Sequence, residues 1–274
     1  MALSVNTNVM SMTAQRNLSG TQSGLATAME RLSSGLRINS AKDDAAGLAI
    51  ASRMNAQVRG MNVAIRNAGD AISLSQTAEG GLNEITNMLQ RMRELSVQSA
   101  NATNSASDRT NLDAEYQQLD SEITRQIGAT RFNGVAIIGT GAGANVFQVG
   151  ADAADTISVT TANLATDASV VAVGTSAITS AALATTAIGL VDTALDTITT
   201  NRATYGAVQN RFESVISNLQ VASENQAAAA GRIMDADFAM ETANLTRYQI
   251  LQQAGTAMVA QANSAPQSIL SLLQ

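Results

Sequence analysis

The chain contains neither cysteine nor histidine. Their absence excludes disulfide bonds, thiolate and imidazole metal ligands, and catalysis by a cysteine nucleophile or a histidine base. Aromatic residues make up only 3% of the 274 positions. A thick globular core is therefore not expected, and burial must come from Ala, Leu, Ile, Val and Met in thin helical packing. No constellation of acid, base and nucleophile emerges, so we predict no enzymatic activity and no catalytic, metal-binding or cofactor-binding residues.

Charged residues are also sparse. They make up 14% of the chain, where an ordinary domain carries about 25%, and the formal net charge is -6. Because binding to phosphate backbones needs clustered Lys and Arg, we expect no nucleic-acid partner. The N-terminus lacks the basic segment and apolar run of a secretory signal, and no stretch approaches about 18 consecutive apolar residues, so we expect no membrane partner.

The first half of the chain carries a helical pattern. Apolar residues recur at alternating steps of four and three from Leu18 to Leu36, which predicts a helix over about 5–34 with one apolar seam. An irregular connector with Gly, Asn and adjacent Asp residues follows at 35–47. Residues 50–100 contain no proline and predict a second helix of roughly 80 Å at 1.5 Å per residue. A third helix over about 112–127 should fold back antiparallel on the second.

The middle of the chain changes in character. Residues 132–201 contain no Lys or Arg and five Asp, and short apolar runs separated by glycines predict a small β-hairpin region at about 132–180. The GTGAGA segment superficially resembles a dinucleotide-binding loop. The residues after it continue as a strand rather than a helix, so we interpret it as a flexible turn.

Helical periodicity returns near residue 180 and holds from Val191 to Leu219. A last helix is expected over 237–263, ended by Pro266, the only proline. The apolar seams predicted for the two ends of the chain, and expected to drive assembly, consist of Leu18, Leu25, Met29, Leu32, Leu36, Leu251, Ala254 and Met258.

These terminal seams lack partners nearby in the sequence, and pairing the two ends satisfies both at once. We therefore expect a mainly α fold: a long antiparallel helical rod whose N- and C-terminal helices pair as a coiled coil, with the small β-hairpin region in the middle of the chain. The expected domains are a terminal coiled-coil domain of 1–45 and 235–274 and a rod domain of 46–234. Such a molecule is suited to packing sideways against copies of itself.

Five separated blocks resemble bacterial flagellin, in the order found in that family. The blocks are Arg31–Ala51, Leu89–Ser105, Arg131–Gly134, Ala207–Ser214 and Gln249–Leu273. The resemblance covers about 1–150 and 190–274. It implies a structural subunit, exported through a dedicated type III channel, that self-assembles into the extracellular flagellar filament used for motility. It also implies that the terminal domain lines the inner tube of the filament and that the large outer domains of many flagellins are missing here.

The resemblance implies further partners. These are the flagellar cap and hook-associated proteins, an export chaperone that binds 237–274, and innate immune receptors of the host. Residues 30–51 resemble the segment detected by the plant flagellin receptor. The positions read by the animal Toll-like receptor for flagellin are matched by Arg91, Glu94, Leu95, Gln98 and Glu115. Met92 and Ser96 depart from the commoner Val and Ala, but the charged positions are intact, so we expect recognition to be retained.

Two other functions are compatible with parts of this pattern. A hook–filament junction protein shares the terminal helix pattern but usually matches the internal flagellin motifs less closely. A surface adhesin would place a glycan-binding function in the middle segment.

Overall fold

The computed structural model describes residues 7–270, and their side chains as far as residue 265. The chain forms two compact units. The terminal unit combines the described parts of 1–56 and 225–274, and the central unit comprises 57–224. Two long helices, α2 (Ala45–Ala100) and α5 (Ala181–Met234), continue from one unit into the other.

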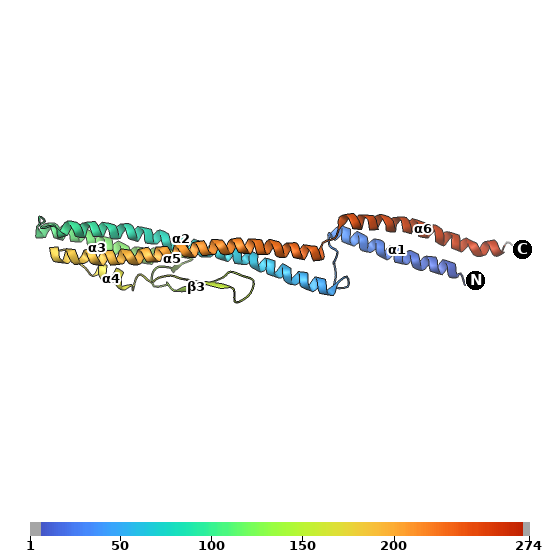
Figure 1. Ribbon diagram of the computed structural model, residues 1–274, viewed down its shortest axis with the longest axis horizontal. Helices are drawn as coiled ribbons and strands as arrows, with labels where there is room; N and C mark the ends of the chain where they lie inside the picture. The colour runs from blue at the N-terminus through green and yellow to red at the C-terminus, as the bar shows by residue number, and fades with distance from the viewer. Residues whose placement is uncertain (1–6, 271–274) are drawn as a thin grey trace. The chain divides into compact units, whose positions relative to one another are not determined.

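The terminal unit is built on the helices α1 (Val9–Ser34) and α6 (Phe238–Leu270), which lie side by side (Figure 1). The side chain of Asn8 caps the start of α1 by accepting a hydrogen bond from the Ser11 N–H at 3.1 Å. Gly35 ends the helix in the left-handed region at φ 72°, a conformation that glycine adopts without a steric penalty. The predicted pairing of the N- and C-terminal helices is confirmed, whereas the predicted start at Val5 lies outside the described residues.

The connector after α1 is tied to the chain segment before α6. The Arg37 N–H donates to the Met234 carbonyl at 2.6 Å, and Leu36 forms an isolated β-bridge with Asp235. The next helix, α2, begins at Ala45, five residues earlier than predicted. Asp44 explains the difference, because its carboxylate accepts a hydrogen bond from the Gly47 N–H at 2.8 Å and caps a first turn that contains glycine.

The last helix runs further than the sequence predicts. α6 continues to Leu270, so the expectation that Pro266 ends it is wrong. A proline removes one backbone donor. Near a helix end that loss affects a single hydrogen bond, and the helix continues for about one more turn.

The central unit consists mainly of three helices, in which α3 (Ala106–Ala129) and α5 both run antiparallel to α2 (Figure 1). The direction of α3 against α2 follows from the ion pair of Arg91 with Glu115 and from the contact of Gly81 with Thr130. The direction of α5 against α2 follows in the same way from the ion pairs of Arg93 with Asp192 and of Glu79 with Arg202. The predicted return of the third helix along the second is confirmed.

The core of the central unit is thin and aliphatic. Side chains from all three helices meet in it, and many are alanines, which let the helix backbones approach closely. Burial of each leucine-sized side chain stabilises the fold by about 1.5–3 kcal/mol. The largest fully buried side chains on the helices are Leu82, Ile85, Leu89, Met92, Leu95, Tyr116, Ile123, Tyr205 and Phe212.

The predicted β-hairpin region is confirmed as two small antiparallel sheets. The first joins β1 (Arg131–Phe132) to β2 (Val135–Ala136) through Asn133 and Gly134, both at positive φ. The second pairs β3 (Ala144–Gln148) with β4 (Thr156–Thr160) in the register Val146 to Ser158. A short helix, α4 (Ala168–Gly174), follows these strands. The sequence does not predict it, because its Ala, Ser and Val residues carry no helical periodicity over so few positions.

One helix, α5, is apolar enough to be compared with a membrane-spanning segment, which the count of consecutive apolar residues does not predict. Among the described residues, α5 contains an 18-residue window with mean hydropathy 1.3, long and apolar enough to cross a membrane by length and composition alone. Its side chains at Val191, Ala194 and Ile198 are fully buried against α2 and α3 within the central unit. Core packing accounts for these apolar positions, although only 28% of the window is buried.

Candidate functional site

The two terminal helices meet along a seam in which the less exposed residues recur at steps of three and four. On α1 these residues include Ser11, Ala14, Leu18, Thr21, Leu25, Ala28 and Leu32. On α6 they include Glu241, Leu245, Tyr248, Gln252, Gly255, Val259 and Ala262. The spacing is that of an antiparallel coiled coil. Small and polar residues are frequent in it, since eight of these fourteen residues are Ala, Gly, Ser, Thr, Gln or Glu.

Polar contacts fix both ends of this seam. At one end, the Asn8 side-chain amide donates to the Ala262 carbonyl and the Ser11 hydroxyl donates to the Asn263 side chain, both at 2.7 Å. At the other end, Arg31 lies 4.0 Å from the carboxylate of Glu241, a residue only 8% exposed.

The predicted seam residues of α1 fall in three places. Leu18, Leu25 and Leu32 face α6 on the seam. Met29 is 56% exposed and does not face α6. Leu36 lies beyond the helix in the bridge with Asp235.

The predicted seam residues of α6 lie at the exposed edge of the helix pair. Leu251 is 42% exposed, Met258 is 63% exposed, and Ala254 is exposed as well. They therefore lie beside the packed seam and not within it. The true seam carries Glu241, Gln252 and Gly255, which a search for apolar periodicity cannot select, so the search found the neighbouring outer face instead.

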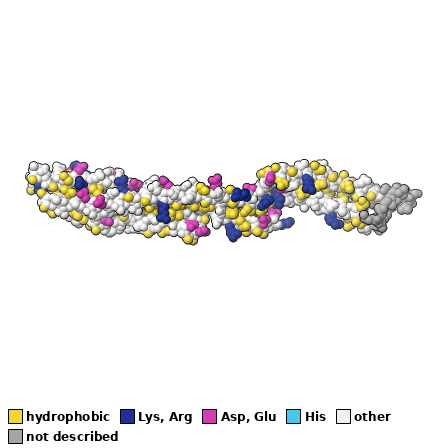
Figure 2. Space-filling model, viewed as in Figure 1, with side chains coloured by type: hydrophobic (Ala, Val, Ile, Leu, Met, Phe, Trp, Pro, Cys, Tyr) yellow, Lys and Arg dark blue, Asp and Glu magenta, His cyan; other side chains and the backbone are white. Residues whose placement is uncertain are grey.

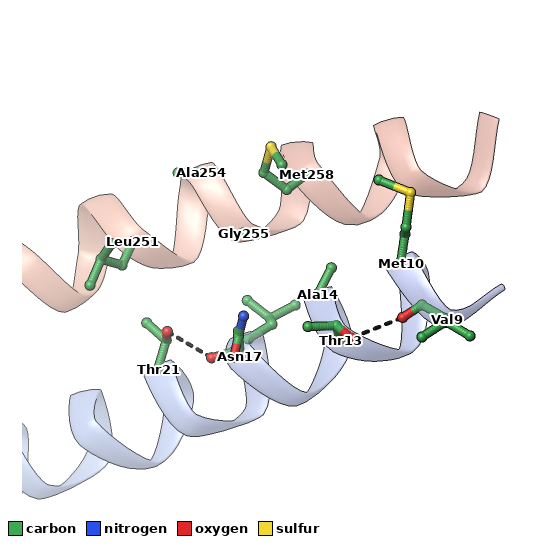
Figure 3. A pocket seen from close by; sticks show the side chains of 11 residues that line it. Val9, Met10, Thr13, Ala14, Asn17, Thr21, Leu251, Ala254, Gly255 and Met258 are labelled. Atoms are coloured by element: carbon green, nitrogen blue, oxygen red, sulfur yellow. Dashed lines mark hydrogen bonds between the residues drawn. The ribbon is translucent and has the colours of Figure 1, made fainter. Parts of the chain in front are cut away.

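That outer face forms one wall of a groove of about 560 Å³ along the helix pair (Figure 3). Its lining residues are Val9, Met10, Thr13, Ala14, Asn17, Leu18, Thr21, Leu251, Ala254, Gly255 and Met258. Val9 and Met10 are each more than 60% exposed. Figure 2 shows further hydrophobic side chains exposed along this unit. Phe238 and Met240 of α6 are also exposed, at 56% and 65%. A contiguous exposed apolar surface of this kind marks an interaction site.

A second candidate surface lies on α2 and α3 in the central unit. Arg91 donates to Glu115 at 2.9 Å and to Glu94 at 3.0 Å, and these two hydrogen-bonded carboxylates raise the pKa of the Arg91 guanidinium, that of Glu94 most. The side chains of Arg91, Glu94 and Glu115 are 48%, 68% and 46% exposed. Gln98 is exposed on the same helix. Four of the five predicted receptor positions are therefore accessible.

The fifth position is not accessible. Leu95 is fully buried in the core of the central unit, so its assignment to a receptor-reading surface is wrong. Position 95 lies one helical step from Glu94 but points inward, since neighbouring residues on a helix face directions about 100° apart. Leu95 instead holds α2 against the other helices and so positions the exposed charges.

Comparisons with known proteins show which family this chain belongs to. Residues 5–142 match the model of the bacterial flagellin N-terminal helical region, and residues 188–273 match that of the C-terminal helical region. The chain belongs to the bacterial flagellin family. As a flagellin it is a structural subunit of the extracellular flagellar filament. The unmatched segment, 143–187, contains β3, β4 and α4.

Similar flagellins cover the whole chain. A flagellin of Halalkalibacterium halodurans is 46% identical over 98% of this chain and 99% of its own length. Flagellin D of Vibrio anguillarum is 36% identical over the full length of both chains, in an alignment of 377 positions, so it carries residues that this flagellin lacks. The crystal structure of Bacillus cereus flagellin matches with a TM-score of 0.51 and 35% identity, over 60% of this chain and 94% of that one.

Proposed function

We propose that the groove between α1 and α6 is the surface through which this filament subunit binds neighbouring copies of itself. The observation that carries the proposal is the exposure of large apolar side chains, such as Met10 and Met258, on a helix pair whose own seam is poor in them. Burying that surface against a second copy stabilises the contact by about 25 cal/mol per Å² of apolar area. Head-to-tail contacts that do not close into a ring generate a helical polymer.

The proposed mechanism couples ordering of the terminal helices to assembly. Because the α1–α6 seam is small and polar, the helix pair gains much of its apolar burial only when copies stack. We assign residues 1–45 and 235–274 to the inner tube of the filament and residues 46–234 to the surrounding layer, without a large outer domain. The match of the Halalkalibacterium flagellin over nearly its whole length supports a form of this size.

Substitutions in the groove test this function. Changing Leu251 and Met258 together to Ser should raise the lowest protein concentration at which filaments grow at least tenfold, because both side chains leave water only on assembly. Leu183→Ser is the matched control, since Leu183 is 47% exposed in the central unit. The measurement is sedimentation of polymer over a concentration series, with electron microscopy of the pellet. Normal growth of the double variant would refute the groove as the docking surface, and a wild type that never forms long filaments would favour the junction protein.

We further propose that Arg91, Glu94, Gln98 and Glu115 form a surface read by the animal Toll-like receptor for flagellin. Their exposure and the defined geometry of the Arg91 ion pairs support this assignment. Soluble monomer should activate the receptor, and Arg91→Ala should reduce that activation at least tenfold. Arg125→Ala is the control, because Arg125 also forms an exposed ion pair on α3, with Glu122. A silent wild type, or equal loss in both variants, would contradict the assignment.

We propose three further interactions for the ends of the chain. The export chaperone would bind 237–274, and the exposed apolar residues Phe238, Met240 and Ile250 support this by offering an unpaired surface before assembly. The segment 30–51 would be detected by the plant flagellin receptor, and the cap and hook-associated proteins would contact the terminal helices at the filament ends.

A further inference from the structure

A glycine on α1 receives an aromatic ring from α6. A Cβ atom placed on Gly24 would lie 2.6 Å and 2.7 Å from two carbons of the Tyr248 ring, closer than van der Waals contact allows. A second, looser contact of this kind lies further along the pair, where a Cβ on Gly255 would be 3.1 Å from Leu18 Cδ1. Gly20 lies one turn from Gly24 on the same helix and has no atom within 4 Å of its Cβ position. The need for a glycine is therefore specific to position 24.

The contacts along the pair define one antiparallel register. Tyr248 lies opposite Gly24, Glu241 opposite Arg31 and Asn263 opposite Ser11. Coiled coils slip most easily by whole heptads, because the seam residues then still meet. A slip of seven residues would place the Tyr248 ring opposite Asn17 or Arg31, where a side chain already occupies the space. Among these heptad-related registers, only the observed one places a glycine opposite the ring.

We infer that Gly24 and Tyr248 form the pair that sets the register of α6 on α1, and that this register builds the assembly groove. The inference rests on the proposed docking function of the groove. Leu251 and Met258 come from α6, whereas Val9 and Met10 come from α1, so the groove exists only where the two sets are level with each other (Figure 3). A slip of one heptad would move one wall about 10 Å along the other.

The register can be measured in assembled filaments by a disulfide. The natural chain contains no cysteine, so Ser11→Cys with Asn263→Cys introduces a single reporter pair where the native polar atoms are 2.7 Å apart. Mild oxidation of filaments then gives an intramolecular disulfide in the observed register. A gel separates this product from intermolecular dimers. In this background the comparison covers Gly24→Ala, its control Gly20→Ala, and Tyr248→Phe, which keeps the ring.

Gly24→Ala should lower the intramolecular disulfide yield at least threefold and raise the concentration needed for filament growth at least threefold, or abolish growth. Gly20→Ala and Tyr248→Phe should leave both quantities within a factor of about 1.5. The inference is overturned if Gly24→Ala gives the same disulfide yield and filament growth as the Ser11→Cys, Asn263→Cys protein without it. It is also overturned if Gly20→Ala lowers both as strongly as Gly24→Ala does. Failure of the docking function is distinguishable, because the Leu251 and Met258 substitutions would then leave growth unchanged while the disulfide yields still report the register.

Discussion

At the scale of single residues, burial decides what each side chain contributes. Arg91 and Leu95 are four positions apart on α2, yet one forms exposed ion pairs and the other is fully enclosed in the core. Asp120 of α3 shows the cost of burying charge. Its carboxylate lies against Gly174, with Oδ1 2.6 Å from the position that a Cβ on that glycine would take, and burial raises the pKa of Asp120 above the ordinary value of 3.8.

Asp120→Asn should therefore stabilise the central unit at pH 7. A carboxyl whose pKa is raised in the folded state favours its protonated form there, so ionisation reduces stability as the pH rises above the unfolded value. The gain in melting temperature should be a few degrees at pH 7 and should vanish as the pH falls below 3.8. Thermal unfolding of monomer across this pH range measures it.

Glu122→Gln provides a control of opposite sign. The pKa of Glu122 is lowered by its hydrogen bond with Arg125, so its ionised form stabilises the fold above the unfolded pKa and loses that effect as the pH falls. This variant should be slightly less stable than wild type at pH 7. A loss of stability in Asp120→Asn at pH 7 would contradict the burial argument.

At the scale of elements, local sequence signals place the helices and long-range contacts place the strands. The α3 helix begins with a full capping box, in which the Ser105 hydroxyl accepts from the Asp108 N–H at 3.2 Å while Asp108 accepts from the Ser105 N–H at 3.0 Å. The β3–β4 hairpin depends instead on a residue far away in the sequence. Phe147 packs edge-on against Phe212 of α5, with ring centroids 5.9 Å apart.

Removing the cap should destabilise α3 measurably. Ser105→Ala loses the acceptor for the Asp108 N–H and should lower the free energy of unfolding by about 1 kcal/mol. Ser107→Ala is the control, because Ser107 is exposed in the first turn beyond the cap. Urea unfolding of the monomer followed by circular dichroism measures both, and equal stability of the two variants would rule out a role for the cap.

The sequence predicts the helices well because their signals are local. Leu82 and Leu89 lie two helical turns apart on α2, and Ile198 belongs to a similar apolar pattern on α5. The structure buries all three side chains in one core. The sequence does not predict the residues that face a partner helix through polar contacts between distant parts of the chain. Glu241 and Tyr248 face α1 although neither extends an apolar pattern, so Leu251 and Met258 were assigned to the seam in their place. No local feature marks Gly24 as the residue that receives the Tyr248 ring.

At the scale of the whole molecule, the two units differ in how far they bury their own large apolar side chains. The central unit encloses its largest apolar side chains, including Tyr116 and Phe212, and leaves mainly valines exposed. The terminal unit leaves many of its own exposed, and the residues lining the α1–α6 groove are the main example. In the proposed mechanism, assembly supplies the missing burial, so that a subunit with few aromatic residues and no disulfide forms a stable polymer.

Hydrogen–deuterium exchange of the full-length protein, as monomer and as filament, tests this account most directly. Backbone amides of α1 and α6 should exchange quickly in the monomer and at least a hundredfold more slowly in the filament. Amides of the buried parts of α2, α3 and α5 should be protected in both states. Equal, strong protection of α1 and α6 in the free monomer would contradict the claim that assembly completes the terminal unit.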